Sequence, residues 1–501
     1  MSRSLFFTGS LLVLLGTGGA GLAGCGNNTP GGSGGGGSGG EGSPSSSSAG
    51  GAGGVGGQGG TGGIGVGGQG GTGGIGVGGQ GGTGGIGVGG QGGTGGIGVG
   101  GQGGTGGVGV GGQGGGVGGA GGGEGGAGGS VEPPPDQDKD GWTVLEGDCC
   151  DNSIKCSKPE GVNPGAFEYL GNGIDDDCDP TTPDDVPPAD CAGAPLSVPT
   201  SSLKLVKAMD LCQITTENPP HPQKKWGVIS SSLLLADGSS ASLPKDLQVG
   251  VLEDFGPNVK PKKGPTMAAL STGTARAEGD PGHVYPQSGP DPVAQKGNYD
   301  AGTVVSAPAQ YLEANGNKLP SPASCPDCVG ADCTKAFDSV NLKMRIRVPT
   351  NAKSFSYRLK FYSAEYPEYV CGQYNDFFVT LLKSSAPGIP ADRNIAFDAA
   401  KNAVSVNNAF FEVCFPSPAL PLSTCPSGTL ELIGTGMGGW NGDIRDGGGS
   451  VWLVNEAPVV PGETIEIEFI TWDAGDHNVD STVLLDNFRW GLSPTEVGTH
   501  K

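Results

Sequence analysis

Apolar and polar residues alternate with a period of two in several stretches of the second half of the chain. In residues 342–348 every second position is Leu, Met, Ile or Val, and residues 355–361 and 464–472 repeat this alternation. Shorter apolar runs follow at 377–382, 483–485 and 488–490. Such runs, separated by Gly, Pro, Asn and Asp, are typical of antiparallel strands with one buried face. They predict a mostly β chain that contains a large antiparallel β-sandwich of the jelly-roll type.

The first quarter of the chain lacks this alternation. Residues 25–130 are dominated by glycine, and the sequence GGQGGTGGIGV recurs there with a period of eleven, marked by glutamines from Gln58 to Gln113. Each repeat offers only Ile and Val as large apolar residues, so it buries too little surface to offset its ordering entropy. The repeats predict a disordered tether with a root-mean-square length of ~55–60 Å. An ordered glycine-rich helix or sheet is the alternative.

Proline-rich segments divide the rest of the chain. Residues 131–180 form a module rich in acids and cysteines, residues 181–190 are a Pro/Asp linker, and residues 191–493 have the composition of a globular domain. Within that domain only residues 203–211 have a helical pattern.

The net charge of −22 is concentrated in the module. Between Glu132 and Asp190 there are 16 acidic residues against three lysines. Nucleic-acid binding needs a basic footprint, so this class of function is excluded. A local excess of carboxylates suits cations, although a solvated acidic linker has the same composition.

Residues 1–24 have the features of an export signal. Arg3 precedes an apolar stretch at 5–15 that is too short to span a membrane as a mature helix. The segment ends in LAGC, with the cysteine at position 25, and this ending resembles the signal of bacterial lipoproteins. The resemblance implies an exported protein held in a membrane by acyl chains on Cys25, in the outer membrane at the cell surface. An ordinary secretory signal is the alternative.

Cysteine usage agrees with export. Besides Cys25 there are twelve cysteines, an even number that suggests up to six disulfides in an exported chain. They are Cys149, Cys150, Cys156, Cys178, Cys191, Cys212, Cys325, Cys328, Cys333, Cys371, Cys414 and Cys425. Because Cys333 follows the C-x-x-C pair of Cys325 and Cys328 closely, a disulfide-pinned loop is favoured there over a redox or zinc site.

The start of the module has the spacing of a calcium loop. Asp136, Asp138 and Asp140 alternate, and Gly141 follows at once. Oxygen ligands at positions 1, 3 and 5 with glycine at position 6 match the first half of an EF-hand-type loop. A hard cation needs six to eight oxygens, and glycine permits the sharp turn between them. Position 12, where a bidentate Glu is expected, is Gly147.

Asp148 and Asp151 are expected to complete the shell of oxygens. The sequence blocks DQDKDGW, EGDCCD, VNPGAFE and GNGIDDDCD, in this order, resemble the MopE-type metal-binding motif of bacterial surface proteins. They are also similar to thrombospondin type 3 calcium repeats. The resemblance implies metal ligands at Asp136, Asp138, Asp140, Asp148 and Asp151, with Asp175, Asp177 and Asp179 as further candidates.

The cysteines of the module depart from the pattern of that family. The family has a cysteine where this chain has Leu170, and this chain has Cys150 and Cys156 instead. The pairing must therefore differ, and we expect Cys149–Cys178 and Cys150–Cys156. The expected metal is Ca²⁺ rather than copper, because copper favours His, Met or thiolate ligands and no histidine lies between 131 and 190. A metal-free acidic linker is the alternative.

Residues 191–493 carry a second resemblance. The blocks FYSAEYPEYVCGQYNDFFVTLL, NIAFDA, VNNAFFEVC and WDAGDHNVDSTVLLDNFRW, in this order, look like the choice-of-anchor L domain of bacterial surface proteins. The resemblance implies a β-sandwich on a surface-anchored protein and no established activity.

Acidic residues gather in the expected turns of this domain. The candidates for a second metal site or a binding rim are Glu365, Asn375, Asp376, Asp473, Asp476, Asp480 and Asp486. Jelly-roll domains often close a rim with carboxylates around a calcium ion. The alternative is that these side chains cap turns and bind their own backbone.

Two classes of function follow. The favoured one is a non-enzymatic surface lipoprotein, in which a calcium-rigidified spacer presents a β-sandwich for adhesion or for binding an extracellular glycan or protein ligand. The other is a hydrolase of extracellular polysaccharide, which needs two carboxylates at a fixed separation; Glu365 and Asp486 are the first pair to test.

Overall fold

The computed structural model describes five short segments of the glycine-rich region and most of the chain after residue 134. The described residues are 64–66, 75–77, 86–88, 98–99, 109–110, 135–182, 184, 191, 201–240, 246–286, 299–408, 410–416, 424–438 and 446–501. The chain divides into two compact units, Met1–Gly128 and Gly129–Lys501. Cys25 and the expected export signal lie outside the described residues, so the lipid anchor stays a prediction.

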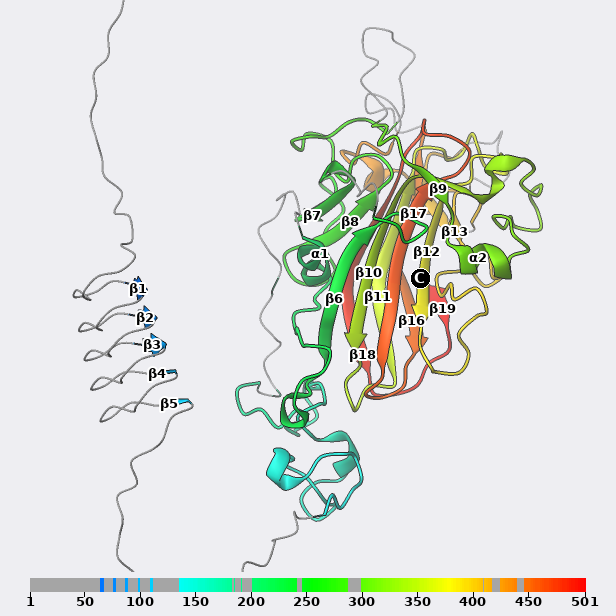
Figure 1. Cartoon of the computed structure of the whole chain (residues 1–501). Coiled ribbons are helices and arrows are strands. Elements are labelled where there is room, and N and C mark those ends of the chain that lie inside the picture. The colour runs from blue at the N-terminus through cyan, green and yellow to red at the C-terminus, as the bar shows by residue number, and fades with distance from the viewer. Residues whose placement is uncertain are drawn as a thin grey trace, which may run out of the picture. The chain divides into compact units, whose positions relative to one another are not determined.

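The glycine-rich unit contains five short parallel strands, drawn in blue in Figure 1. They are β1 (Ile64–Val66), β2 (Ile75–Val77), β3 (Ile86–Val88), β4 (Gly98–Val99) and β5 (Gly109–Val110). Each pairs with the next in the register of the repeat, so that Ile64 lies opposite Ile75. These segments have the ordered arrangement that was the alternative to a tether. The rest of residues 25–130 lies outside the described residues, and a tether there stays a prediction.

The second unit is a β-sandwich made of two antiparallel sheets, as predicted (Figure 1). The six-stranded sheet contains, in order, β13 (Val404–Ser405), β12 (Phe377–Lys383), β17 (Thr464–Asp473), β10 (Lys335–Arg347) and β6 (Gly227–Leu234), with β9 (Val304–Ser306) also paired to β10. The eight-stranded sheet contains β14 (Phe411–Cys414), β15 (Gly448–Ser450), β11 (Ser354–Ser363), β18 (Ser481–Gly491), β8 (Met267–Ser271) and β7 (Val249–Leu252), with β16 (Leu453–Pro458) between β11 and β19 (Gly498–His500).

Helical structure is scarce in the described part of the second unit. It consists of α1 (Ser202–Ala208), α2 (Ala309–Ala314) and single 3₁₀ turns. The turns are Val144–Glu146, Pro159–Gly161, His221–Gln223, Asp246–Gln248, Ala331–Thr334 and Leu430–Leu432. The longer of the two α-helices has only seven residues, so among the described residues no helix could cross a membrane.

The core lies between the two sheets because each sheet turns one face of alternating side chains inward. Met344 of β10 and Leu359 of β11 are fully buried in one apolar cluster, whereas Lys343 and Arg345 face outward. The predicted strands are therefore confirmed, and so is a helix within 203–211, although it ends at Ala208. The runs 483–485 and 488–490 belong to one continuous strand, β18. The pattern did not predict α2, and β19 extends the sheet beyond residue 493.

All twelve cysteines of this unit form disulfides. The module contains Cys149–Cys178 and Cys150–Cys156, as expected. The remaining four bonds join Cys191–Cys212, Cys325–Cys371, Cys328–Cys333 and Cys414–Cys425. The C-x-x-C pair is thus divided between two bonds and pins a loop, which confirms that prediction.

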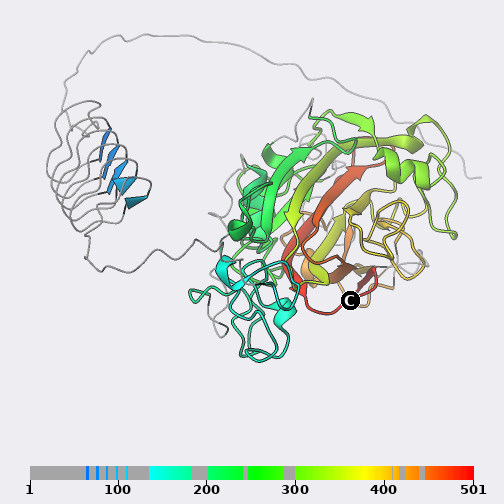
Figure 2. The same cartoon turned by 60° about the horizontal axis from the view of Figure 1, so that its bottom comes forward.

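The acidic module packs against the turn between β10 and β11. The Thr350 amide donates to the Gly165 carbonyl at 3.0 Å. The Asn351 side chain donates to the Phe167 carbonyl at 2.9 Å and accepts from the Phe167 amide at 3.0 Å. An ion pair of 3.1 Å between Lys225 and Asp179 adds a polar contact. The module is therefore docked on the sandwich, and Figure 2 shows it, in cyan, beside the sheets.

Candidate functional site

The first candidate site is the acidic loop at the start of the module. Gly141 has a φ of 95°, a conformation in which glycine is favoured, and the chain turns there as the calcium-loop spacing predicted. Asp136 accepts from the amides of Lys139 and Gly141 at 2.6 and 3.0 Å. Asp140 accepts from the Trp142 amide at 2.8 Å. These bonds curl the loop and fix the carboxylates on its inner side.

Carboxylate oxygens of this loop converge in two overlapping groups. Asp138 belongs to both, and within each group one oxygen per residue lies within 4.8 Å of the others. The groups are Asp136 with Asp138 and Asp140, and Asp138 with Asp148 and Asp151. The five primary candidates of the module are therefore brought together. One oxygen of Asp138 and one of Asp148 are buried without a hydrogen-bond partner.

Burial raises the pKa of carboxyls in this loop. It brings the pKa of Asp138 to about 6, with the neighbouring carboxylates of Asp136 and Asp148 adding to the effect. Burial also raises the pKa of Asp140 to about 6 and raises that of Asp148. A bound cation would reverse this effect, because an opposite charge favours the ionised form.

The end of the module forms a smaller group that the sequence only partly indicated. Asp175 and Asp177 lie with Glu168 within 4.8 Å, and one oxygen of Glu168 is buried without a partner. Burial raises the pKa of Glu168 to about 7. Glu168 was missed as a candidate, although it ends the GAFE block of the motif. The carboxylate of Asp179 is instead bound by the Thr181 amide and hydroxyl, which with Lys225 lower its pKa to about 2.

The second candidate site lies inside the sandwich. Glu365, Asp376, Asp473 and Asp480 are each at most 2% exposed, so they form part of the interior rather than a rim. Burial raises the pKa of Asp376 to about 7. Burial, followed by the charge of Asp376, raises the pKa values of the other three carboxyls well above the ordinary range.

The other predicted members of that group have different surroundings. Asp486 accepts from the amides of Lys262 and Lys263. Asp476 accepts from the Asn478 amide at 2.9 Å, and Asn375 accepts from the Asn407 amide at 3.0 Å. For these three residues, turn capping and backbone binding describe the observed contacts.

A further acidic group borders the buried four and was not found in the sequence. Asp300 and Asp338 lie with His477 within 4.8 Å; the His477 Nδ1 atom is 3.0 Å from Asp338. Asp338 is fully buried in β10, next to a register shift between Phe337 and Val340. An irregular strand start with a polar residue inside it was the only signal in the sequence.

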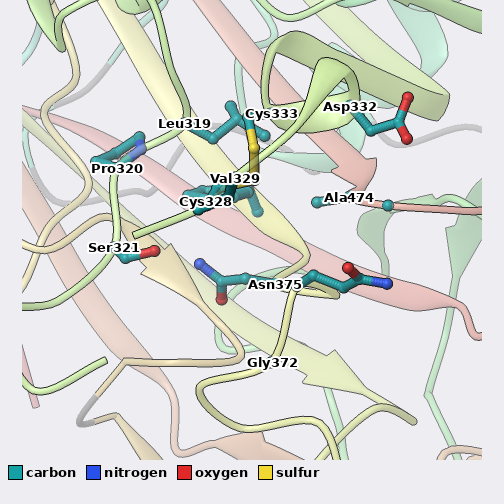
Figure 3. Close-up of a pocket in the computed structure, with 13 residues that line it drawn as sticks. Leu319, Pro320, Ser321, Cys328, Val329, Asp332, Cys333, Gly372, Asn375 and Ala474 are labelled. Atoms are coloured by element: carbon teal, nitrogen blue, oxygen red, sulfur yellow. A yellow bond between two sulfur atoms is a disulfide. The ribbon is translucent and has the colours of Figure 1, made fainter. Parts of the chain in front are cut away.

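A small open pocket lies next to the buried carboxylates, since Asn375 and Ala474 line it (Figure 3). Figure 3 shows the Cys328–Cys333 disulfide and Leu319 on one side and Asn375 across from them. Its other lining residues are Pro320, Ser321, Val329, Asp332, Gly372, Gln373, Phe377 and Gly475. Two disulfides, Cys328–Cys333 and Cys325–Cys371, hold the loops around it.

The first pair considered for glycoside hydrolysis, Glu365 and Asp486, lies too far apart for that reaction. Asp486 is opposite Arg358, whereas Glu365 follows the end of β11 at Ser363. Five strand residues separate these positions, or about 17 Å at ~3.3 Å per residue, well above the ~5–9.5 Å of glycosidase pairs. Among the described residues that line the pocket, Asp332 is the only acid.

Comparison with protein families matches part of the sandwich. Residues 329–488 match the model of the Choice-of-anchor L domain, which includes β10, β11, β12, β17 and most of β18. This family is not an enzyme family, and the match suggests a non-enzymatic protein associated with the cell surface. No curated protein and no solved structure matches the chain.

Proposed function

We propose that this protein is a non-catalytic surface lipoprotein in which a calcium-stabilised module holds a β-sandwich in a fixed orientation for ligand binding. Acyl chains on Cys25 would supply the membrane anchor, in the outer membrane. The ligand is an extracellular glycan or protein, and the pocket beside Asn375 is the place for it.

The observation that carries the proposal is the link from the acidic loop to the sandwich. Asp140 accepts from the Asn163 side chain at 2.7 Å. The oxygen of the same Asn163 side chain accepts from the Thr350 hydroxyl at 2.6 Å. A cation held by Asp140 therefore also fixes the residue that docks the module onto the β10–β11 turn.

The donor set of the loop supports calcium as the cation. Hard divalent cations take oxygen ligands, and calcium accepts six to eight of them at ~2.3–2.6 Å. The converging side chains of the two groups are all carboxylates, two of which have buried oxygens without a partner. Without a cation, burial and, to a smaller extent, mutual repulsion disfavour the ionised carboxylates, as the raised pKa values of Asp138 and Asp148 indicate.

The placement of the pocket supports a presenting role. The module contacts the turn that follows the last residue of β10, Arg347, which pairs with Thr464 at the start of β17. The pocket lies near the start of β10, where Phe337 pairs with Asp473, the last residue of β17. About ten strand residues, or roughly 33 Å, separate the two ends, so the pocket lies at the other end of β10 from the docked module.

A calcium titration of the full chain tests the proposal. We expect the variant Asp138→Asn/Asp148→Asn to lose the calcium uptake of the module. In the parent chain, amide exchange of residues 136–151 should slow about 100-fold at a free calcium concentration 100 times the dissociation constant. The variant should show no such slowing.

A matched control removes the same number of charges, one from the module and one from the linker that follows it. In Asp179→Asn/Asp184→Asn, neither residue belongs to a converging group, because Asp179 binds Thr181 and Asp184 caps residues 171–173. This control should keep the calcium response. If the parent chain showed no uptake in this loop at millimolar calcium, the calcium part of the proposal would be wrong.

Ligand binding is tested separately with a glycan array, in calcium and in EDTA. Binding that is weakened by Asn375→Ala and by Asp332→Asn would support the pocket as the site. Turnover of a polysaccharide by the purified chain would overturn the non-catalytic assignment.

A further inference from the structure

Five copies of the eleven-residue repeat follow one another without interruption from residue 56 to residue 110. Four copies read GGQGGTGGIGV, and the fifth differs only by Val108 in place of Ile. The strands β1 to β5 lie at the ends of successive copies, and each pairs in parallel with the next (Figure 1). One line of paired positions therefore runs across the whole stack through Val66, Val77, Val88, Val99 and Val110.

The two ends of this stack are complementary. An inner strand of a parallel sheet pairs through one edge with the strand before it and through the other edge with the strand after it. In the described part of the glycine-rich unit, β1 pairs only with β2, and β5 pairs only with β4. Because β4 and β5 have the same sequence, the free edge of β5 offers the backbone groups that β4 offers to β5. A further strand of the same repeat therefore fits beside β5.

The composition of the repeats leaves these free edges unprotected. The edge of a sheet carries unpaired N–H and C=O groups that can pair with another chain, and many proteins prevent this with proline or charged residues on the edge strand. Residues 56–110 consist of Gly, Gln, Thr, Ile and Val alone. The repeats thus lack both the steric and the electrostatic protection of an edge.

A second copy of this chain is the occupant that matches the two edges best. The sequence on either side of the five copies does not continue the repeat, since residues 45–55 read SSSSAGGAGGV and residues 111–121 read GGQGGGVGGAG. Neither segment ends in the Ile-Gly-Val or Val-Gly-Val of the repeats. A second copy, in contrast, brings strands with the required sequence, direction and spacing.

We propose that β5 of one copy pairs in parallel with β1 of a second copy, in the register of the repeat, so that chains associate end to end through their glycine-rich units. The line of paired positions then continues across the contact, with Val66 of the second copy opposite Val110 of the first. The contact uses a different edge on each copy. A pair of chains therefore still has one free edge at each end, and further copies can add to it.

The contact between free chains should be weak, because β1 has only three residues and forms few hydrogen bonds. The net charge of −22 adds repulsion between copies, which salt at about 0.15 M screens beyond ~8 Å. Chains that are held close together gain from a high local concentration. The membrane anchor of the proposed function would provide this concentration, but the pairing of the two edges does not rest on that function.

Two charged variants of the full chain test the contact. Val66→Asp/Val110→Asp places like charges at positions that face each other only between copies, whereas Val66→Lys/Val110→Asp places opposite charges there. Within one copy, the two positions pair with Val77 and Val99 in both variants. Sedimentation at concentrations up to ~1 mM detects weak association. The mean mass of the parent should rise with concentration, and the association constant of the Lys/Asp variant should exceed that of the Asp/Asp variant roughly fivefold or more.

Controls define the opposite outcomes. Val55→Asp/Val117→Asp adds two charges outside the five copies and should associate like the parent. Deleting residues 78–88 removes one inner copy but keeps both ends, so association should persist, whereas deleting residues 56–110 should abolish it. The inference would be overturned if the parent stayed monomeric, if its growth stopped at dimers, or if the two charged variants associated to the same degree.

Discussion

Lys360 shows how a single charge is accommodated inside the sandwich. It is fully buried, and its ammonium group donates to Glu431 at 2.6 Å and to the Ser450 carbonyl at 2.5 Å. The Tyr362 ring lies 5.1 Å away. Burial lowers the pKa of Lys360, and the Glu431 carboxylate counteracts this effect.

The first prediction concerns that ion pair. Lys360→Ala should destabilise the fold by about 3 kcal/mol, because it removes one partner of a buried pair and leaves a void. Lys360→Met, which keeps the stem, should cost less. The exposed Lys383 is the control, and Lys383→Ala should change the free energy of unfolding by ~0.5 kcal/mol or less. Urea midpoints measure all three, and equal effects at both positions would contradict the assignment.

The second prediction concerns pH and Asp486. Burial raises its pKa from 3.8 to about 7, so the folded chain binds this proton more tightly than the unfolded chain. Stability from this group is present below pH ~4 and is lost as the pH rises to ~7, by up to about 1.4 kcal/mol per pH unit. Asp486→Asn should remove this loss. Parallel stability curves for the variant and the parent between pH 4 and 8 would contradict it.

For single residues, the sequence indicated which side chains are candidate ligands better than it indicated which of them lie close together in the fold. The regular spacing of the loop from Asp136 to Asp140 identified carboxylates that do converge, because a short loop fixes their geometry locally. In the sequence, Glu365 and Asp486 were a candidate catalytic pair. The strand register shows that they lie far apart. Asp338 was missed because a single acid near the irregular start of a strand is only a weak local signal.

Among the elements, the loops around the pocket depend most on covalent bonds. Cys325–Cys371 connects the loop after α2 to the 364–376 connection, over 46 residues of sequence. Cys328–Cys333 closes a span of only five residues. Because loop entropy grows with length, the longer bond should contribute more to stability.

The third prediction follows from that difference. Cys325→Ser/Cys371→Ser should destabilise the chain by about 3–4 kcal/mol and expose residues 319–334 to proteases. Cys328→Ser/Cys333→Ser should destabilise it less, by about 2 kcal/mol. Denaturation and limited proteolysis measure the two effects. An equal loss of stability in the two variants would contradict the loop-length argument.

Element type was predictable where side chains alternate, and less so elsewhere. β10, β11 and β17 have one buried and one polar face, which the period of two expresses directly. The short helix α2 has only Tyr311 and Leu312 buried, too few for a helical pattern. β19 has no apolar run, since its sequence is GTH, and its pairing with β16 is a tertiary effect.

At the scale of the whole molecule, the module and the sandwich act as one body through a small polar interface. Thr350 and Asn351 make its central hydrogen bonds. The Trp142 and His221 rings, 4.6 Å apart, add an aromatic contact between the module and the loop before β6. Composition predicted a separate spacer, because nothing in the sequence of the module reveals which surface it contacts.

The fourth prediction tests this interface. Thr350→Val/Asn351→Ala should release the module and increase amide exchange at residues 163–169 by at least about tenfold, since each lost buried hydrogen bond weakens docking by roughly 1 kcal/mol or more. Exchange in β10 and β11 should stay unchanged. Ser385→Ala, at an exposed turn of the sandwich, is the control. Unchanged exchange at 163–169 would show that other contacts hold the module.

Because β1 to β5 pair in parallel in the register of the repeat, the length of this stack of strands depends on the number of paired repeats. Neighbouring strands of a sheet are ~4.8 Å apart, so each copy of the eleven-residue unit that stacks in this way adds one such step. Fully extended, the same eleven residues would reach ~36–40 Å. Duplicating or deleting one copy would therefore shift the reach of the stack by a small, fixed increment and leave Ile opposite Ile. An insertion of any other size would break that alignment.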